Sequence, residues 1–284
     1  MHITKLLFVT FGIMAGVSTG LQAQFNYTIN ADLTVTITGY TGPGGAVTIP
    51  PMINSLLVTS IGGSAFLGSS LTSITIPSGV TSIGAGAFWN CGSLTSITIP
   101  SGVTTIVDGT FYQCVSLTNI TIPSSVTTIG SSAFYDCTSL AIVSIPNSVT
   151  TIGDSAFAGC TNLAGVYFHG NTPSLGGTNV FSGADYSILY YLPGTVGWGT
   201  TFAGRPALPC NPQVLDSSVG VRANQFGFTF TGSYGMLIVV EACTSLDNPV
   251  WVPMQTNTLG VGTVYFNDPN STHYVRRFYR LRSP

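Results

Sequence analysis

The stretch Leu94-Thr-Ser-Ile-Thr-Ile-Pro100 returns 23 residues later as Leu117-Thr-Asn-Ile-Thr-Ile-Pro123. Each copy continues through a Val-Thr-x-Ile segment to a phenylalanine and then to a cysteine. The cysteines keep the same period of 23 residues, at Cys91, Cys114, Cys137 and Cys160. A unit this short cannot bury its apolar side chains alone, so consecutive copies must stack into a solenoid.

Within one copy, the order of residue types predicts a β-strand with one buried face. Ile74 and Ile76 alternate with Ser73 and Thr75. Pro77 then ends the strand because it has no N–H to donate to a sheet. The rest of the unit should close in a short turn-like or helical segment that ends at the cysteine.

We therefore expect a repeat solenoid, mainly β with short helical turns, followed by a small all-β, sandwich-like module. Alternating residues around Asn30-Ala-Asp32 predict a hairpin that covers the first rung. The expected segments are a signal peptide over 1–23, an N-terminal β-hairpin cap over 24–48, repeats over 49–185, a C-terminal cap over 186–205, a linker over 206–213 and the all-β module over 214–284.

The first residues have the pattern of a secretory signal. Lys5 supplies a positive charge, an apolar run follows over 6–17, and Leu21-Gln-Ala23 offers a cleavage site. A membrane anchor is the alternative, but the run is short for a span of ~20 residues. We expect the mature chain to be secreted or attached to the extracellular surface, with no transmembrane span.

Charge is scarce and unevenly distributed. Only 6% of residues are charged, against 44% hydrophobic, and the net charge is −2. Residues 24–204 contain five acids and no Lys or Arg, whereas all six Arg lie from 205 onward. A nucleic-acid partner for the repeats is excluded on this ground, since phosphates need clustered cations.

The motif L-x-x-I-x-I-P-x-x-V-x-x-I-G-x-x-A-F-x-x-C resembles the BspA-like, or Treponema-type, leucine-rich repeats over roughly residues 45–205. The resemblance implies a secreted or surface-attached bacterial protein that binds host proteins, other cells or surface glycans. It brings no catalytic residues and no ligand site that could be assigned to positions here. The C-terminal segment looks like β-modules that close secreted bacterial multidomain proteins, although Cys243 departs from them.

The cysteines are expected to be buried free thiols that fill the same core position in each rung. Disulfides within the row and a metal site are the alternatives, but neighbouring rungs hold side chains parallel rather than directed at each other. Cys210 and Cys243 differ, because they flank the domain junction of an exported chain. A disulfide between these two is possible.

Catalysis has few candidate groups. Asp108 and Asp154 share a repeat position two rungs apart, roughly 10 Å at the usual strand spacing, which could suit an inverting carboxylate pair. Solvated acids are the preferred interpretation, and His169 is expected in a surface turn. We expect no enzyme activity, no cofactor and no metal.

Two rows of outward side chains are the candidate ligand surface. Threonine is also simply a good strand residue on a wet face, so the rows alone do not prove binding. Ile142 and Tyr167 at the C-terminal end are the natural binding hot spots. The rows consist of Ser73, Ser96, Asn119 and Ile142, and of Thr75, Thr98, Thr121, Ser144 and Tyr167.

Four cations cluster near the C-terminus, at Arg276, Arg277, Arg280 and Arg282. Their charges either prevent an exposed edge strand from pairing with another chain or bind an anionic surface polymer.

The leading hypothesis is an extracellular, non-catalytic adhesion or recognition protein with a protein or glycan ligand on a cell or matrix surface. A self-assembling structural surface protein is the alternative. A carbohydrate-active enzyme and an ice-binding solenoid rank last. The ligand and the oligomeric state stay open.

Overall fold

The computed structural model describes residues 24–210, 213–232, 237–247, 249–259 and 263–282. The signal peptide expected over 1–23 lies outside these residues. None of the described helices is long and apolar enough to cross a membrane.

A β-hairpin covers the N-terminal end of the solenoid. Strands β1 (Phe25–Ile29) and β2 (Val35–Tyr40) pair in antiparallel, and β2 pairs in parallel with β5 (Leu56–Ile61). The cap is shorter than the expected 24–48. Strand β3 (Gly45–Thr48) already pairs in parallel with β6 (Leu71–Thr75), because its Val-Thr-Ile-Pro continuation repeats the strand motif.

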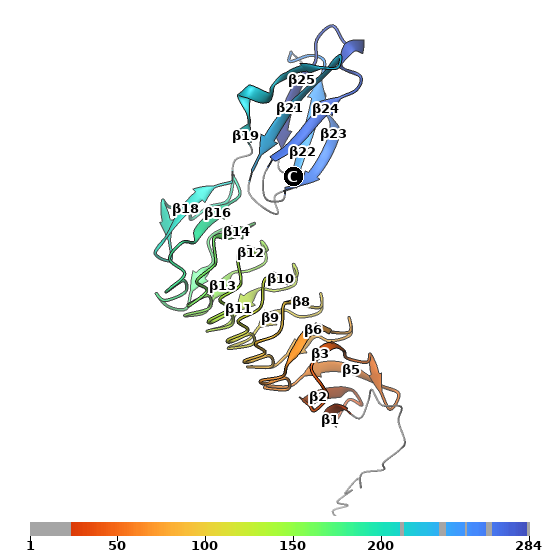
Figure 1. The fold of residues 1–284 in the computed structure, drawn as a ribbon, viewed down its shortest axis with the longest axis vertical. Helices are drawn as coiled ribbons and strands as arrows, with labels where there is room; N and C mark the ends of the chain where they lie inside the picture. The colour runs from red at the N-terminus through yellow and green to blue at the C-terminus, as the bar shows by residue number, and fades with distance from the viewer. Residues whose placement is uncertain (1–23, 211–212, 233–236, 248, 260–262, 283–284) are drawn as a thin grey trace, which may run out of the picture.

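Each rung of the solenoid contributes one strand to a face that we call the long-strand face (Figure 1). After β3 and β6, this face is built by β8 (Ser96–Thr98), β10 (Asn119–Thr121), β12 (Ile142–Ile145), β14 (Gly165–Phe168), β16 (Ile188–Tyr191) and β18 (Arg205–Pro209).

A second face, the short-strand face, is formed by two-residue strands that follow β5. These are β7 (Ser82–Ile83), β9 (Thr105–Ile106), β11 (Thr128–Ile129), β13 (Thr151–Ile152) and β15 (Ser174–Leu175). Two further short strands complete the ends of the array, β4 (Met52–Ile53) beside β5 and β17 (Thr201–Phe202) beside β18.

The third side, the turn face, consists of turns, which is the turn-like form of the expected closing segment and not the helical one. Alternate N–H groups are used between rungs, as when Phe88 donates to the Thr110 carbonyl at 2.9 Å and Phe111 to that of Ala133 at 2.8 Å. The N–H groups between them close turns within the rung, as when Trp89 donates to the Gly86 carbonyl at 2.9 Å, so no run of i to i−4 bonds forms. The repeat therefore forms no helix within the described residues.

One phenylalanine per rung forms a stack along the centre of the solenoid. Neighbouring rings have centroids 5.1–5.5 Å apart and planes within 14° of parallel. All six are at most 1% exposed, and they are Phe66, Phe88, Phe111, Phe134, Phe157 and Phe181. This stack joins the inward-facing Leu, Ile and Val side chains into one continuous core.

The solenoid extends further toward the C-terminus than expected. Residues 206–209 are not part of a linker, because β18 pairs in parallel with β16. The Arg205 guanidinium holds this last rung through Asp185 Oδ1 at 2.6 Å and the Phe181 carbonyl at 2.9 Å.

The C-terminal module contains two antiparallel sheets, in line with the expected all-β, sandwich-like fold, and its first strand begins at Gln213. One sheet contains β19 (Gln213–Val214), β20 (Gly220–Arg222), β21 (Gln225–Thr231) and β24 (Thr263–Asp268). The other contains β22 (Leu237–Cys243), β23 (Val252–Thr258) and β25 (Phe278–Arg282). The buried core includes Phe228, Phe230, Ile238, Val240 and Phe266.

Candidate functional site

The long-strand face holds the two candidate rows in register. Asn119 lies beside Ser96, Thr121 beside Thr98, and Ser144 beside Tyr167. The isoleucines between the rows point into the core, because side chains alternate along a strand. In the N-terminal part of the face the row residues are exposed, except for the half-buried Ser73.

The hydrogen-bond ladder of this face is broken between β10 and β12. The backbone N–H of Thr118 donates to Thr95 at 3.0 Å, and that of Ala164 donates to Ala141 at 2.9 Å. No backbone bond joins Ala141 to Thr118 within the described part of the chain, and β10 and β12 belong to separate sheets.

The break is confined to one side of the solenoid. At the same level, Thr150 donates to the Thr127 carbonyl at 2.9 Å on the short-strand face. On the turn face, Phe134 donates to Ala156 at 2.8 Å. The rungs are thus held together on two sides and open on the third.

At the break between β10 and β12, the repeat also loses a threonine that earlier rungs have. The Thr95 hydroxyl donates to the Thr72 carbonyl at 3.0 Å, and the Thr118 hydroxyl donates to that of Thr95 at 3.1 Å. Ala141 occupies the next position of this row and has no hydroxyl to donate. Ala141 was not among the predicted site residues; its change of residue type is visible in the sequence but does not by itself locate the break.

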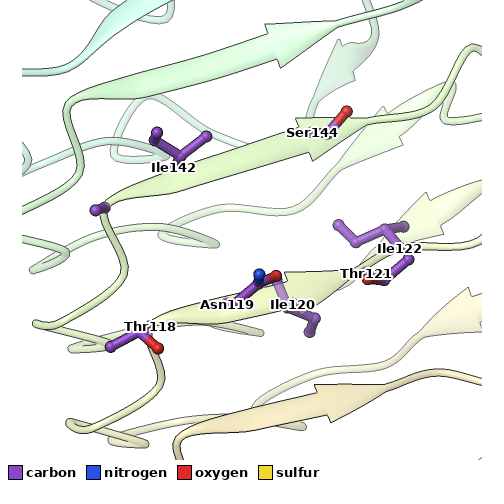
Figure 2. A pocket seen from close by; sticks show the side chains of 8 residues that line it. Thr118, Asn119, Ile120, Thr121, Ile122, Ile142 and Ser144 are labelled. Carbon is purple, nitrogen blue, oxygen red and sulfur yellow. The ribbon is translucent and has the colours of Figure 1, made fainter. Parts of the chain in front are cut away.

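A groove runs from this opening toward the C-terminal end of the face. Its first part is a cavity of about 380 Å³, and Figure 2 shows Asn119 and Thr121 on β10 across from Ser144 on β12. A second cavity of about 390 Å³ continues from it and shares Ile122 and Ser144. The groove is lined by Thr118, Asn119, Ile120, Thr121, Ile122, Ala141, Ile142, Ser144, Pro146, Asn147, His169 and Leu192.

His169 lies half-buried in the bend that follows β14 and lines this groove. It replaces the proline that ends the strand in earlier rungs, so its N–H can donate to the Ile145 carbonyl at 3.0 Å. Its Nε2 lies 2.8 Å from the Ser144 hydroxyl. Burial lowers the pKa of His169 below its ordinary value, which favours the neutral ring at neutral pH.

The C-terminal module covers the end of the face. Tyr167 and Tyr190 stack with centroids 4.9 Å apart, and both pack with Leu192 against the core of the module. Tyr167 is therefore a half-buried contact inside the protein, contrary to its expected role as an open hot spot. Ile142 remains at the groove.

Comparison with known proteins places this architecture in a family. Residues 59–187 match the BspA type leucine rich repeat region in six copies. The crystal structure of a T. pallidum leucine-rich-repeat protein is 32% identical, with 66% of this chain and 84% of that chain covered and a TM-score of 0.56. The chain belongs to the BspA-type leucine-rich-repeat family.

A leucine-rich-repeat protein from Bacteroides ovatus is also similar, at 27% identity, with 59% of this chain and 54% of that chain covered and a TM-score of 0.48. No curated protein matches the sequence. The family match ends before the C-terminal module.

The cysteines of the BspA-type repeats are buried thiols, as expected. Each Sγ donates to the carbonyl of a phenylalanine in the preceding rung, at 3.0 Å for Cys91 and 3.1 Å for Cys114, Cys137 and Cys160. Burial raises the pKa of Cys91 and of Cys160 to about 12. These thiols are structural.

The possible disulfide between Cys210 and Cys243 is not formed. Cys243 is a free, buried thiol. Cys210 belongs to the core cluster with Ile238 and Val240, whereas Cys243 lies outside that cluster.

Asp108 and Asp154 take part in the stacking of the repeats. Oδ1 of Asp108 accepts the Ser131 N–H at 2.8 Å, and Oδ1 of Asp154 accepts the Asn179 N–H at 3.1 Å. The Asn179 N–H is the main reason why the pKa of Asp154 is lowered. Each carboxylate thus caps the next rung.

Three of the four C-terminal arginines are paired within the module. The side chain of Glu241 accepts from Arg280 at 2.7 Å and from Arg282 at 3.0 Å. Arg277 lies 2.7 Å from Asp268. These arginines flank or belong to β25, an end strand of its sheet, so their arrangement favours a guarded edge over a site for an anionic polymer.

Proposed function

We propose that this protein is a secreted or cell-surface recognition protein that binds a protein or glycan ligand in the groove of the long-strand face, without catalysis. The observation that carries the proposal is the broken ladder between β10 and β12, which opens the candidate face where its polar rows run. The export signal in the sequence and the repeat architecture support it.

The lining of the groove suits a neutral ligand. It contains no Asp, Glu, Lys or Arg, and its one titratable side chain is the half-buried His169. Ile122 and Ile142 offer apolar contact, while Asn119, Thr121 and Ser144 offer directional hydrogen bonds. Specific sites commonly combine a mostly apolar surface with a few placed polar groups.

The Ser144–His169 pair does not make the groove a hydrolase site. A serine nucleophile needs a base that is itself oriented by a third group. Across the described ranges, no carboxylate bonds to His169. Ser144 also lies within a regular strand, β12, and not on a strand-to-helix turn that would expose it.

A binding screen tests the proposal. The mature chain, residues 24–284, is immobilised and exposed to cell surfaces, matrix proteins and a glycan array. We expect saturable retention of at least one ligand. Failure to retain any of them would contradict the proposal.

A pair of matched variants then locates the site. Thr121→Arg places a long cation in the groove, whereas Thr75→Arg makes the same change in the same row two rungs away. We expect Thr121→Arg to abolish binding and Thr75→Arg to leave it unchanged. Equal effects of the two variants would move the ligand site away from the groove.

A further inference from the structure

The turn face carries an aromatic row that the groove does not use. At the position after the core phenylalanine, successive rungs have Leu67, Trp89, Tyr112, Tyr135 and Ala158. The ring centroids of Trp89 and Tyr112 lie 4.4 Å apart, and those of Tyr112 and Tyr135 lie 4.7 Å apart. Trp89 is 41% exposed, so a large apolar ring faces solvent at one end of the stack.

The stack ends at Trp89 because the preceding rung has Leu67. One face of the Trp89 ring meets Tyr112, and no other aromatic ring of the described chain stacks on its second face. Gly86 helps to keep the ring open. Its φ of +60° favours glycine, and a Cβ there would lie 3.3 Å from the Trp89 ring.

A cavity of about 460 Å³ lies beside these rings, within the size range of ligand pockets. Its lining combines two aromatic rings with a carboxylate, serines and small residues. It is formed by Ser64, Ala85, Gly86, Trp89, Asp108, Gly109, Tyr112, Ser131 and Ser132.

Next to this cavity, one rung has a valine, Val107, at a position where the neighbouring rungs have glycine. Its side chain separates this rung from the preceding one. Gly84 and Gly130 approach the preceding rung so closely that a Cβ on either would lie 2.7 Å from a backbone carbonyl carbon. Val107 occupies the equivalent position. Strands β7 and β9 at this level are not paired, whereas β9, β11 and β13 are.

Asp108 presents an acceptor at the cavity. Its Oδ1 takes the Ser131 N–H, and within the described residues nothing donates to Oδ2. The residue is exposed. An ionised carboxylate accepts hydrogen bonds and cannot donate them, so its complement is a ligand that carries hydroxyl or amide donors.

We propose that this cavity is a binding site for a neutral saccharide. The C–H groups of a sugar ring would lie on the exposed part of the Trp89 ring, because the face of an aromatic ring carries negative charge density. Oδ2 of Asp108 would accept from a sugar hydroxyl, and the lining serines would exchange hydrogen bonds with others. The site lies on a different face from the groove and is independent of it.

Charge favours a neutral ligand over an ionic one. The lining contains no Lys, Arg or His to hold an anion, and Asp108 would repel it. An organic cation would prefer several ring faces around it, but Trp89 lies tilted by 33° against Tyr112, which itself stacks on Tyr135, so these rings form one row and do not surround a cation. The serine-rich lining also matches a ligand with many hydroxyls.

Titration calorimetry with the mature chain tests the site, using cellohexaose, laminarihexaose, maltohexaose, mannohexaose and chitohexaose as probes and choline as the cationic probe. We expect one of the sugars to bind with an affinity that does not change with salt, since a neutral ligand is not screened. Binding of choline alone, or of no probe, would overturn the proposal.

Matched variants assign the binding to these residues. Asp108→Asn keeps an oxygen for the Ser131 N–H but removes the charge, and Asp154→Asn makes the same change at the same repeat position, where the aromatic row has ended in Ala158. We expect Asp108→Asn to weaken sugar binding by about tenfold, as the loss of one charge-assisted hydrogen bond does, and Asp154→Asn to leave it unchanged.

A second pair removes the ring. Trp89→Ala should abolish sugar binding, while Leu67→Ala, at the exposed neighbouring position, should not. Unfolding midpoints of all four variants are measured alongside, so that loss of structure is separated from loss of the site. Sugar binding that survives both Asp108→Asn and Trp89→Ala in folded protein would overturn the proposal.

Discussion

The Ser144 hydroxyl lies 2.8 Å from Nε2 of His169, and the two residues come from successive rungs of the long-strand face. Burial of the imidazole lowers the pKa of His169 below its ordinary value. Protonation of His169 is therefore costlier in the folded chain than in the unfolded chain.

The pH dependence of stability follows from this shift. Because the folded pKa is below the unfolded value of about 6.5, the unfolded chain binds more protons as the pH falls through that value. His169 should thus leave stability unchanged above about pH 6.5 and reduce it below, until the folded pKa is passed. His169→Gln should remove this step from a plot of unfolding midpoint against pH. An identical step in the variant would contradict the assignment.

Replacing the glycine that follows each short strand by a residue with a side chain should destabilise the protein. A Cβ at Gly153 would lie 2.6 Å from the Gly130 carbonyl carbon. Gly153→Val should therefore destabilise the protein by about 1–3 kcal/mol, as overpacking does, and break the pairing of β11 with β13. Urea denaturation measures the effect. Val107→Gly is the control, because the rungs on either side of Val107 are already separated. It should change the urea midpoint less than Gly153→Val does.

The cysteine row should be inert in the native protein. Its thiols are buried, and the pKa of Cys91 and of Cys160 is raised to about 12, so very little thiolate exists at pH 8. Mass spectrometry after iodoacetamide treatment should find the four repeat cysteines unmodified in the native chain and modified in urea. Alkylation under native conditions would show that the rungs open there.

The position of the C-terminal module should depend on Tyr167. Tyr167→Ala removes the stack on Tyr190 and the contact with the core of the module, and such aromatic pairs contribute about 0.5–1.5 kcal/mol. The radius of gyration from small-angle scattering should rise. Tyr186→Ala is the control, because Tyr186 is 83% exposed. Equal values for both variants would mean that other contacts hold the module.

Much of the fold could be predicted from the sequence because stacking repeats a local rule. The alternation around Ile74 and the end of the strand at Pro77 can be recognised within one repeat. The period of the cysteines then shows that the repeat recurs. The buried thiols follow from the same repeat, whereas the all-β C-terminal module was expected from the residue pattern of its own segment. Of the two expected forms of the closing segment, turn-like or helical, the turn is the one that forms, because alternate N–H groups bond to the next rung and interrupt any helical run.

The groove could not be predicted, because it depends on a bond that is missing between Thr118 and Ala141. Ala164 has no hydroxyl either, yet it pairs with Ala141, so residue type alone does not locate the break. Tyr167 is half-buried by the C-terminal module. How that module packs against the solenoid cannot be predicted from the repeat pattern. The separation of the rungs at Val107 is different, because a valine at a position that is glycine in the neighbouring repeats is visible in the sequence.

Hydrogen exchange of the mature chain with and without a ligand from the binding screen tests the central claim most directly. If the groove binds the ligand, amides of β10 and β12 should gain protection while those of β6 stay unchanged. The unbound chain should also exchange faster at Ala141 than at Ala164, whose N–H is bonded. Protection confined to the turn face or to the C-terminal module would contradict the claim that the groove binds the ligand.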